Sequence, residues 1–297
     1  MDRRQFITAM GVLGAAAALP IPAFASTKKH NYKFGFQLFS VNQDMNRDPI
    51  STLKAVAAMG YEDFEIFGFN GDQGTFYGQK AAAFKTLLDD HNVTVSSGHF
   101  EFAPLLEKSD AALMRFVDQC IEGARTLNMK YITWPWLAPE QRSIENYKAL
   151  CEKLNRMGER VNSAGLGFAY HNHGFEFEDQ GGQNGYDIIL KETDPALVKL
   201  QMDLFWVMHS SKHSPKELVK AQPGRYVMWH IKDMDKKTRD YTELGNGSID
   251  YPSILPDPVA AGMEFYYLEQ GGNFTHSALQ SAADSARYFK QNLQHLF

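Results

Sequence analysis

The chain has 297 residues, of which 44% are hydrophobic and 13% are aromatic. A chain of this length can bury one large core and suits one large α/β domain or two small ones. The formal net charge is −5, and no window is strongly basic beyond Lys28–Lys29 and Lys236–Lys237. Because a nucleic-acid-binding surface needs a basic patch, this charge pattern argues against nucleic acid as a partner.

The first 25 residues have the pattern of an export signal. Arg3 and Arg4 precede an apolar run from Phe6 to Leu19, and the triplet Ala-Phe-Ala at 23–25 offers a cleavage site between small residues. The pattern predicts a twin-arginine signal peptide over 1–25 and residence in a bacterial periplasm. A buried N-terminal helix is the structural alternative. Because the apolar run is too short for a good transmembrane helix, we expect no membrane anchor after cleavage.

From residue 26 on, short apolar runs alternate with amphipathic stretches. The strand candidates cover residues 32–39, 62–69, 93–99, 130–136, 166–173, 197–204, 226–233 and 264–270. Helical periodicity predicts helices over residues 49–59, 78–90, 108–128, 140–164 and 276–294. We expect Ser109 and Asp110 to cap the third of these helices. Cys120 and Cys151 fall on predicted helices, and we expect two buried free thiols.

The order of these elements predicts the fold. Strands that are near-continuous apolar runs are typical of a parallel sheet covered on both faces. Eight βα units within residues 26–297 predict an α/β fold, a single-domain (β/α)8 TIM barrel. A doubly wound open sheet is the competing architecture. It lacks support, because no strand is followed by G-x-G-x-x-G or by G-x-x-x-x-G-K-[ST].

In a (β/α)8 barrel the side chains at the C-terminal ends of the strands face the mouth, where active sites lie. Asp203, His230 and Glu269 lie toward the ends of the last three predicted strands. Asp203 alone could cap a following helical turn, but an ionised carboxylate such as Glu269 beside a buried strand needs a cation or several donors. Two carboxylates and an imidazole on successive strand ends therefore predict a divalent metal site. Such ligands favour Mn²⁺ or Mg²⁺, with Zn²⁺ or Co²⁺ as alternatives.

Several motifs carry a resemblance to a known family. They are FGFQLFSV at the first strand, YHNHGFEF at the fifth, MDLFWV at the sixth, HIKDMD at the seventh, ELGNGSIDY after it and YYLEQ at the eighth. With these motifs the chain resembles the xylose isomerase-like TIM barrel superfamily, also called the sugar phosphate isomerases/epimerases. The resemblance covers essentially the whole chain after the predicted signal peptide.

The resemblance implies a divalent ion held by a glutamate from the fifth strand together with Asp203, His230 and Glu269. The fifth strand ends here at His171 instead of glutamate. Because a turn at Gly174 would bring the following residues back, we expect Glu176 to supply the missing carboxylate, with Glu178 as second choice.

The same resemblance implies proton removal next to a carbonyl group. Glu176 and Glu269 would be the acid and base, and Lys232 with His171 or His173 would donate to the developing oxyanion. We expect other side chains at the strand ends to contact the substrate: Gln37, His99, Trp134, His173 and Trp206.

Together these features predict a metal-dependent isomerase or epimerase that works through an enediolate. Phosphorylated sugars are mainly cytoplasmic, and the sequence has no convincing phosphate loop, so we expect an unphosphorylated sugar or glycoside as substrate. Elimination from the same enediolate makes a lyase or dehydratase acting on keto-sugars or 3-keto-glycosides the alternative. A non-catalytic sugar-binding barrel is a second class. A DNA-repair endonuclease shares the fold but conflicts with the negative charge and the export signal.

Overall fold

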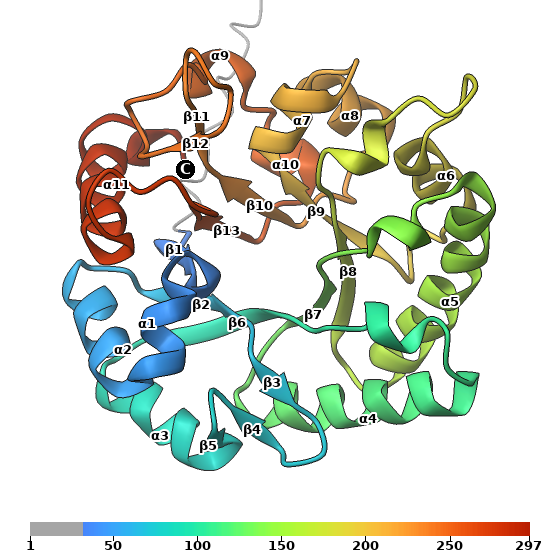
Figure 1. Cartoon of the computed structure of the whole chain (residues 1–297), viewed down its shortest axis with the longest axis horizontal. Helices are drawn as coiled ribbons and strands as arrows, with labels where there is room; N and C mark the ends of the chain where they lie inside the picture. The colour runs from blue at the N-terminus through green and yellow to red at the C-terminus, as the bar shows by residue number, and fades with distance from the viewer. Residues whose placement is uncertain (1–31) are drawn as a thin grey trace, which may run out of the picture. The chain divides into compact units, whose positions relative to one another are not determined.

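The computed structural model describes residues 32–297, which form a closed barrel of parallel strands with helices around it (Figure 1). The strands follow one another around the ring in the order β1, β2, β6, β7, β8, β9, β10, β13, and the ring closes between β13 and β1. This arrangement confirms the predicted (β/α)8 barrel. The predicted signal peptide, residues 1–25, lies outside the described residues.

Each barrel strand lies within one of the eight predicted ranges. The barrel strands are β1 (Gly35–Gln37), β2 (Asp63–Ile66), β6 (Thr94–His99), β7 (Tyr131–Trp134), β8 (Gly167–His171), β9 (Lys199–Asp203), β10 (Met228–Ile231) and β13 (Phe265–Leu268). The other strands are short and belong to loops. They are β3 (Phe69–Asn70), β4 (Thr75–Phe76) and β5 (Gln79–Lys80) after β2, and β11 (Asp233–Met234) and β12 (Tyr241–Thr242) after β10.

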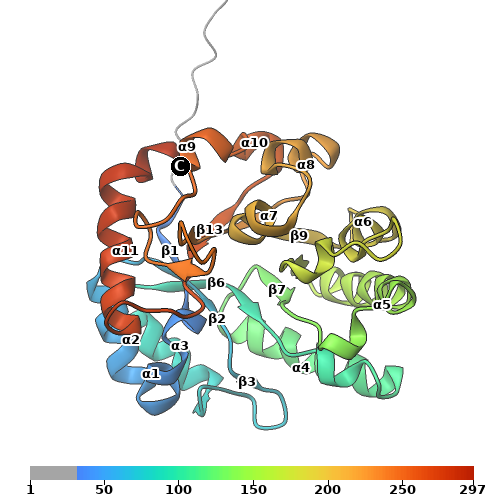
Figure 2. The same ribbon diagram turned by 45° about the horizontal axis from the view of Figure 1, so that its top comes forward.

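The long helices also fall within the predicted ranges, and Figure 2 shows them on the outside of the barrel. They are α2 (Pro49–Ala58), α3 (Ala81–Asp90), α4 (Asp110–Thr126), α5 (Ile144–Ser163) and α11 (Ala278–Asn292). Shorter helices complete the ring: α1 (Asn42–Arg47), α6 (Gly185–Glu192), α7 (Leu204–Ser210), α8 (Pro215–Ala221), α9 (Tyr251–Ile254) and α10 (Pro258–Ala261). The Ser109 side chain accepts a hydrogen bond from the Ala112 N–H, which confirms the predicted cap of α4. Within residues 32–297 no helix has the length and apolar character needed to cross a membrane.

The alternation of side chains along each strand separates two environments. One set of residues points outward and joins the large hydrophobic core between strands and helices, as Ile132, Phe168 and Leu200 do. The other set points into the barrel, where a small apolar cluster that includes Tyr131, Met228 and Tyr267 lies beside buried polar residues. A residue's place in this alternation therefore decides whether it can reach the mouth. Cys120 and Cys151 belong to the outer core and are buried free thiols, as expected.

Candidate metal centre and substrate cavity

Asp203, His230 and Glu269 come together at the mouth of the barrel. Asp203 ends β9, and it pairs in register with His230 on β10. Glu269 directly follows β13, and its N–H donates to the carbonyl of Ile231 on β10. One donor atom from each of the three side chains lies within 4.8 Å of the other two. Adjacent strands with matched register thus bring together three residues that are far apart in the sequence.

The Lys232 ammonium group lies between the two carboxylates. Its Nζ is 2.6 Å from Asp203 Oδ2 and 2.7 Å from Glu269 Oε2. The other Asp203 oxygen, Oδ1, accepts a hydrogen bond from the N–H of Trp206, so this carboxylate also caps α7. Asp203 is therefore both the N-cap of α7 and a carboxylate of the site. Lys232 is buried, and it serves as a positive partner for two acidic groups that burial would otherwise destabilise.

The protonation states of this cluster follow from burial opposed by neighbouring charge. Burial disfavours the charged form of His230, but Glu65 and Glu269 outweigh it and raise the pKa of His230 to about 9. Burial likewise opposes ionisation of Glu269, yet Lys232 and His230 hold its pKa well below the ordinary value. For Asp203, burial outweighs the attraction of Lys232, and its pKa is raised. At neutral pH Glu269 is therefore an ionised carboxylate that can accept a proton.

A second buried carboxylate, Glu65 at β2, supports His230 from the inside of the barrel. Glu65 Oε2 accepts a hydrogen bond from Gln37 Nε2 at 2.7 Å and contacts His230 Nε2. Its Oε1 accepts from Ser97 Oγ and from Gln201 Nε2, both at 2.6 Å. Burial opposes the charge on Glu65, but neighbouring histidines lower its pKa well below the ordinary value. The predicted substrate contact Gln37 is fully buried and contacts this carboxylate.

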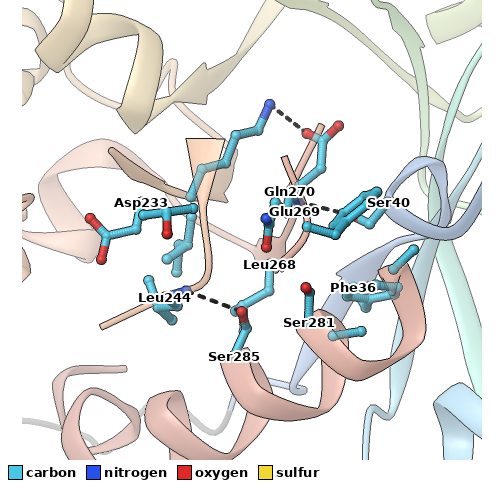
Figure 3. A pocket seen from close by; sticks show the side chains of 15 residues that line it. Phe36, Ser40, Asp233, Leu244, Leu268, Glu269, Gln270, Ser281 and Ser285 are labelled. Atoms are coloured by element: carbon cyan, nitrogen blue, oxygen red, sulfur yellow. Dashed lines mark hydrogen bonds and ion pairs between the residues drawn. The ribbon is translucent and has the colours of Figure 1, made fainter. Parts of the chain in front are cut away.

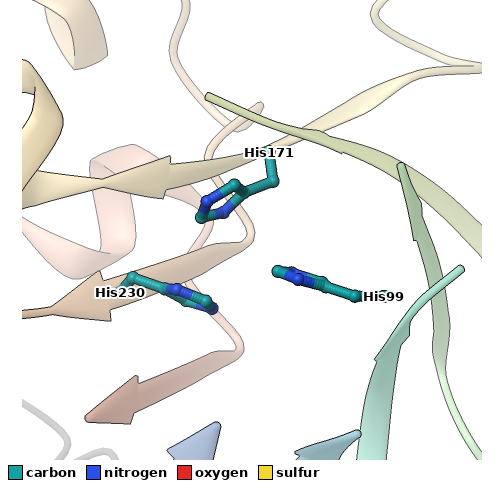
Figure 4. A group of neighbouring side chains, drawn as sticks. All are labelled: His99, His171 and His230. Carbon is teal, nitrogen blue, oxygen red and sulfur yellow. The ribbon is translucent and has the colours of Figure 1, made fainter. Parts of the chain in front are cut away.

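Gln201 was not expected from the sequence, and it orients two histidines. Its Oε1 lies 2.7 Å from His99 Nε2 and 2.9 Å from His171 Nδ1. His99, His171 and His230 form a group whose donor atoms all lie within 4.8 Å of one another (Figure 4). The signal that could have revealed Gln201 is its position two residues before Asp203 on β9, which places both side chains on the inner face.

Glu176 lies away from this cluster, so the structure does not bear out its expected role as a ligand. Its Oε1 accepts a hydrogen bond from Tyr170 OH at 2.9 Å, and its Oε2 accepts from the His173 N–H at 2.8 Å. Tyr170 belongs to the outer core, and Glu176 is fully buried beside it; burial raises the pKa of this carboxyl to about 8. The second choice, Glu178, is exposed. Neither glutamate joins the groups of metal-competent donors among residues 32–297.

His171 instead stands at the position where the resemblance places the first glutamate. It ends β8 and points inward, one residue after the outward-facing Tyr170. Its Nε2 lies 3.7 Å from Asp203 Oδ2. Burial lowers the pKa of His171 well below the ordinary value, so the imidazole is neutral at neutral pH. A neutral imidazole next to Asp203 can serve as a fourth donor to a metal ion.

Trp134, an expected contact with substrate, and Trp136 differ in their positions. Trp134 is fully buried on the outer face of β7, where it stacks on Phe102 at 5.2 Å and donates its Nε1–H to the carbonyl of Trp136. The expectation that Trp134 contacts substrate is wrong, because strand alternation directs it toward the helices. Trp136, two residues later and beyond the end of the strand, is 43% exposed and lines the cavity described below.

His173 and Trp206 lie next to each other at the edge of the site, with ring centroids 5.9 Å apart. Within the described part of the chain, His173 Nδ1 and Trp206 Nε1 are buried without a hydrogen-bond partner. Burial, with the nearby Lys232 charge, lowers the pKa of His173 well below the ordinary value. Unpaired polar groups in such a position are available to a bound ligand.

A cavity of about 570 Å³ opens from the cluster to the surface. Its inner end is formed by His99, His171, His173 and Glu269. The side walls come from the loops after β1, β2, β6 and β7, and they carry Phe39, Phe67, Glu101, Glu107, Trp136 and Glu140. A cavity of this volume accommodates a small organic ligand, because such sites usually measure roughly 300–1,000 Å³.

A much smaller cavity, of about 10 Å³, lies between the barrel and α11 (Figure 3). Glu269 and Gln270 line it, and the Gln270 N–H donates to Ser40 Oγ at 3.0 Å. On its other side the Leu244 N–H donates to Ser285 Oγ at 3.1 Å. This space holds one water molecule at most, so the ligand cavity is the one on the other side of Glu269.

Fold and site together define a class of protein: a (β/α)8 barrel with a buried cluster of metal-competent side chains at the end of a ligand cavity. Residues 53–257 match the model of the family described as Xylose isomerase-like TIM barrel. This chain belongs to that family. No curated protein matches the sequence.

Solved structures show the same fold. A sugar phosphate isomerase/epimerase from Parabacteroides distasonis ATCC 8503 is 26% identical, with a TM-score of 0.73 over 93% of this chain and 99% of that chain. A xylose isomerase-like TIM barrel protein from Mycobacterium smegmatis in complex with magnesium is 17% identical, with a TM-score of 0.62 over 88% and 96%. The IOLI protein with a bound zinc atom is 16% identical, with a TM-score of 0.66 over 89% and 99%. Proteins of this fold thus include metal-bound structures.

Proposed function

We propose that this protein is a divalent-metal-dependent isomerase or epimerase that acts on an unphosphorylated sugar or a glycoside. The observation that carries the proposal is that Glu269 belongs both to the metal-competent group with Asp203 and His230 and to the inner end of the ligand cavity. An ionised carboxylate that is shared in this way can hold an ion and also meet a substrate.

The donor set fits a divalent ion. Asp203, His230 and Glu269 are close enough to share one cation once His230 has released a proton, and His171 is the fourth donor. Two carboxylates and two imidazoles suit Mn²⁺, Zn²⁺ or Co²⁺ better than Mg²⁺, which prefers oxygen ligands. The ion supplies Lewis-acid polarisation of a sugar oxygen.

The chain's own residues supply the proton transfer. Glu269 is ionised and faces the cavity, so it is the base for a proton next to a carbonyl group. Because Glu176 is bonded to Tyr170 elsewhere, we assign the opposite acid/base role to His173, which is neutral, lines the cavity and has a buried Nδ1 without a hydrogen-bond partner among the described residues. The Lys232 ammonium, 2.7 Å from Glu269 Oε2, keeps this carboxylate ionised.

The cavity favours a neutral substrate. Glu101, Glu107, Glu140 and Glu269 line it, and no lysine or arginine does so among the described residues. A phosphate group at the outer walls would meet Glu101, Glu107 and Glu140 without a lysine or arginine among the lining residues, which disfavours binding. This charge pattern supports a sugar or glycoside without phosphate.

Elimination is the second candidate, because the cavity of about 570 Å³ has room for a glycoside. NMR in D₂O distinguishes the reactions when neutral sugars, glycosides and their 3-keto derivatives are supplied with Mn²⁺. Epimerisation or isomerisation introduces deuterium at carbon, whereas a lyase or dehydratase releases an aglycone or water. We expect Glu269→Gln to lower the rate by about 10²-fold or more. Turnover unchanged in Glu269→Gln would contradict the proposal.

We also propose export by the twin-arginine route, on the strength of Arg3, Arg4 and the apolar run that follows. Cell fractionation tests this directly. The wild-type chain should be recovered in the periplasm, and a variant with both arginines changed to lysine should stay in the cytoplasm. Equal distribution of both proteins would contradict export by this route.

A further inference from the structure

We infer that the outer part of the ligand cavity is a subsite for a second, non-reacting sugar ring, with Trp136 as its stacking platform. This inference rests on the proposed function, and it specifies the substrate class as a neutral glycoside of at least two rings. It concerns the loops after β1, β2, β6 and β7, and none of these loops supplies a residue to the metal-competent group of Asp203, His230 and Glu269.

The volume and continuity of the cavity support a ligand longer than one ring. The about 570 Å³ cavity begins at Glu269 and His171 and continues without interruption to the exposed side chains of Phe39 and Trp136. A sugar ring held at Glu269 occupies only the inner end, since cavities of roughly 300–1,000 Å³ accommodate drug-sized molecules. The rest of the volume is therefore available to a group attached to the reacting ring.

Aromatic side chains on two sides provide faces for a sugar ring. Phe39 is 41% exposed and Trp136 is 43% exposed, although most large apolar side chains of the described chain are buried. Phe39 packs edge-on against Phe67 at 5.2 Å, and both line the cavity. The C–H face of a pyranose packs well on such rings, because aromatic faces carry partial negative charge.

The wall that carries Trp136 is fixed before any ligand arrives. Gln141 Nε2 donates to the carbonyl of Ala103, and Gln141 Oε1 accepts from the Ala138 N–H, so the loops after β6 and β7 are tied together. The Arg142 guanidinium lies 5.4 Å from the centre of the Trp136 ring and donates to the carbonyl of Leu137. A rigid wall reduces the entropy lost on binding, as expected of a ligand site.

The polar groups between these aromatic faces suit hydroxyl groups. Glu101, Glu107 and Glu140 are exposed carboxylates on the cavity wall. Carboxylates accept strong hydrogen bonds from hydroxyl groups, and they repel phosphate and carboxylate groups. Aromatic faces combined with charged acceptors therefore match the C–H faces and hydroxyl edges of a neutral sugar ring.

Ligand binding to the full chain with Mn²⁺ tests the subsite. The probes are cellobiose, maltose, lactose and sucrose, each compared with its component monosaccharides by isothermal titration calorimetry. We expect at least one disaccharide to bind about tenfold more tightly than either component. Trp136→Ala should remove most of this advantage, and Trp136→Phe should restore part of it. Ile50→Ala, which changes an exposed apolar side chain on α2 outside the cavity, should keep the full advantage.

Each outcome decides a separate point. If a monosaccharide binds and no disaccharide binds more tightly, the second-ring subsite is wrong and the proposed function stands. If the disaccharide advantage survives in Trp136→Ala, the placement on Trp136 is wrong. If no sugar binds and no deuterium exchange occurs with any sugar, both the subsite and the proposed function are wrong.

Discussion

Replacing Lys232 by methionine tests the electrostatic balance of the site. The buried cluster contains the carboxylates of Glu65, Asp203 and Glu269, and the positive partners are Lys232 and a protonated His230. Lys232→Met keeps much of the side-chain volume, but it leaves the three carboxylates with His230 as their one positive partner. Removing one partner of a buried ion pair typically costs about 3–5 kcal/mol. For a domain of this size, such a loss corresponds to a fall in Tm of roughly 6–20 °C without metal.

Added metal should reverse the effect, because a divalent ion restores the charge that the lysine supplied. In wild type the ion must displace an ammonium group that is 2.6 Å from Asp203 and 2.7 Å from Glu269. We therefore expect Lys232→Met to bind Mn²⁺ or Zn²⁺ more tightly than wild type, and to gain more Tm on metal addition. Thermal unfolding with EDTA and with each metal measures both effects. The control is Lys212→Met, whose lysine is 81% exposed and should change stability by less than about 1 kcal/mol. Equal stability of Lys232→Met and wild type in EDTA, or weaker metal binding by the variant, would refute this reasoning.

Three further predictions address other residues of the barrel. Glu176→Gln should retain the metal, because Glu176 bonds to Tyr170 and not to the cluster; loss of metal on calorimetric titration would restore Glu176 as a ligand. Gln201→Leu should lower metal affinity by about 10–100-fold, because Gln201 orients His99 and His171; unchanged affinity in the same titration would show that the histidines need no such support. Burial raises the pKa of Asp63 from 3.8 to about 6. The protonated Asp63 carboxyl therefore stabilises the folded state below pH 3.8, and this stabilisation is lost as the pH rises to about 6. The free energy of unfolding of wild type should therefore fall by up to about 3 kcal/mol between these two pH values. Urea unfolding at each pH should show that Asp63→Asn lacks this fall.

The sequence was sufficient for the architecture because the barrel depends on local patterns. Apolar runs and helical periodicity placed each barrel strand and long helix within its predicted range. Residues at the ends of β9, β10 and β13 converge because parallel neighbours end at the same edge of the barrel, so Asp203, His230 and Glu269 could be found without coordinates.

The errors arose where the direction of a side chain mattered. In a strand over 130–136, Trp134 and Trp136 would share one face, but β7 ends at the outward-facing Trp134, and Trp136 reaches the cavity from the loop beyond it. Glu176 looked able to reach the site across Gly174, but the chain returns it to Tyr170 on the outer face of β8. The contacts of Glu65 with Gln201 and His230 cross the barrel, and no local pattern could show them.

The most direct test of the account is the metal content of the purified protein after incubation with Mn²⁺ or Zn²⁺ and removal of the free ion. We expect about one equivalent of metal in wild type and in Glu176→Gln, and almost none in Asp203→Ala, with all three proteins folded by circular dichroism. The same low metal content in wild type and Asp203→Ala would contradict the claim that these strand ends form a metal centre.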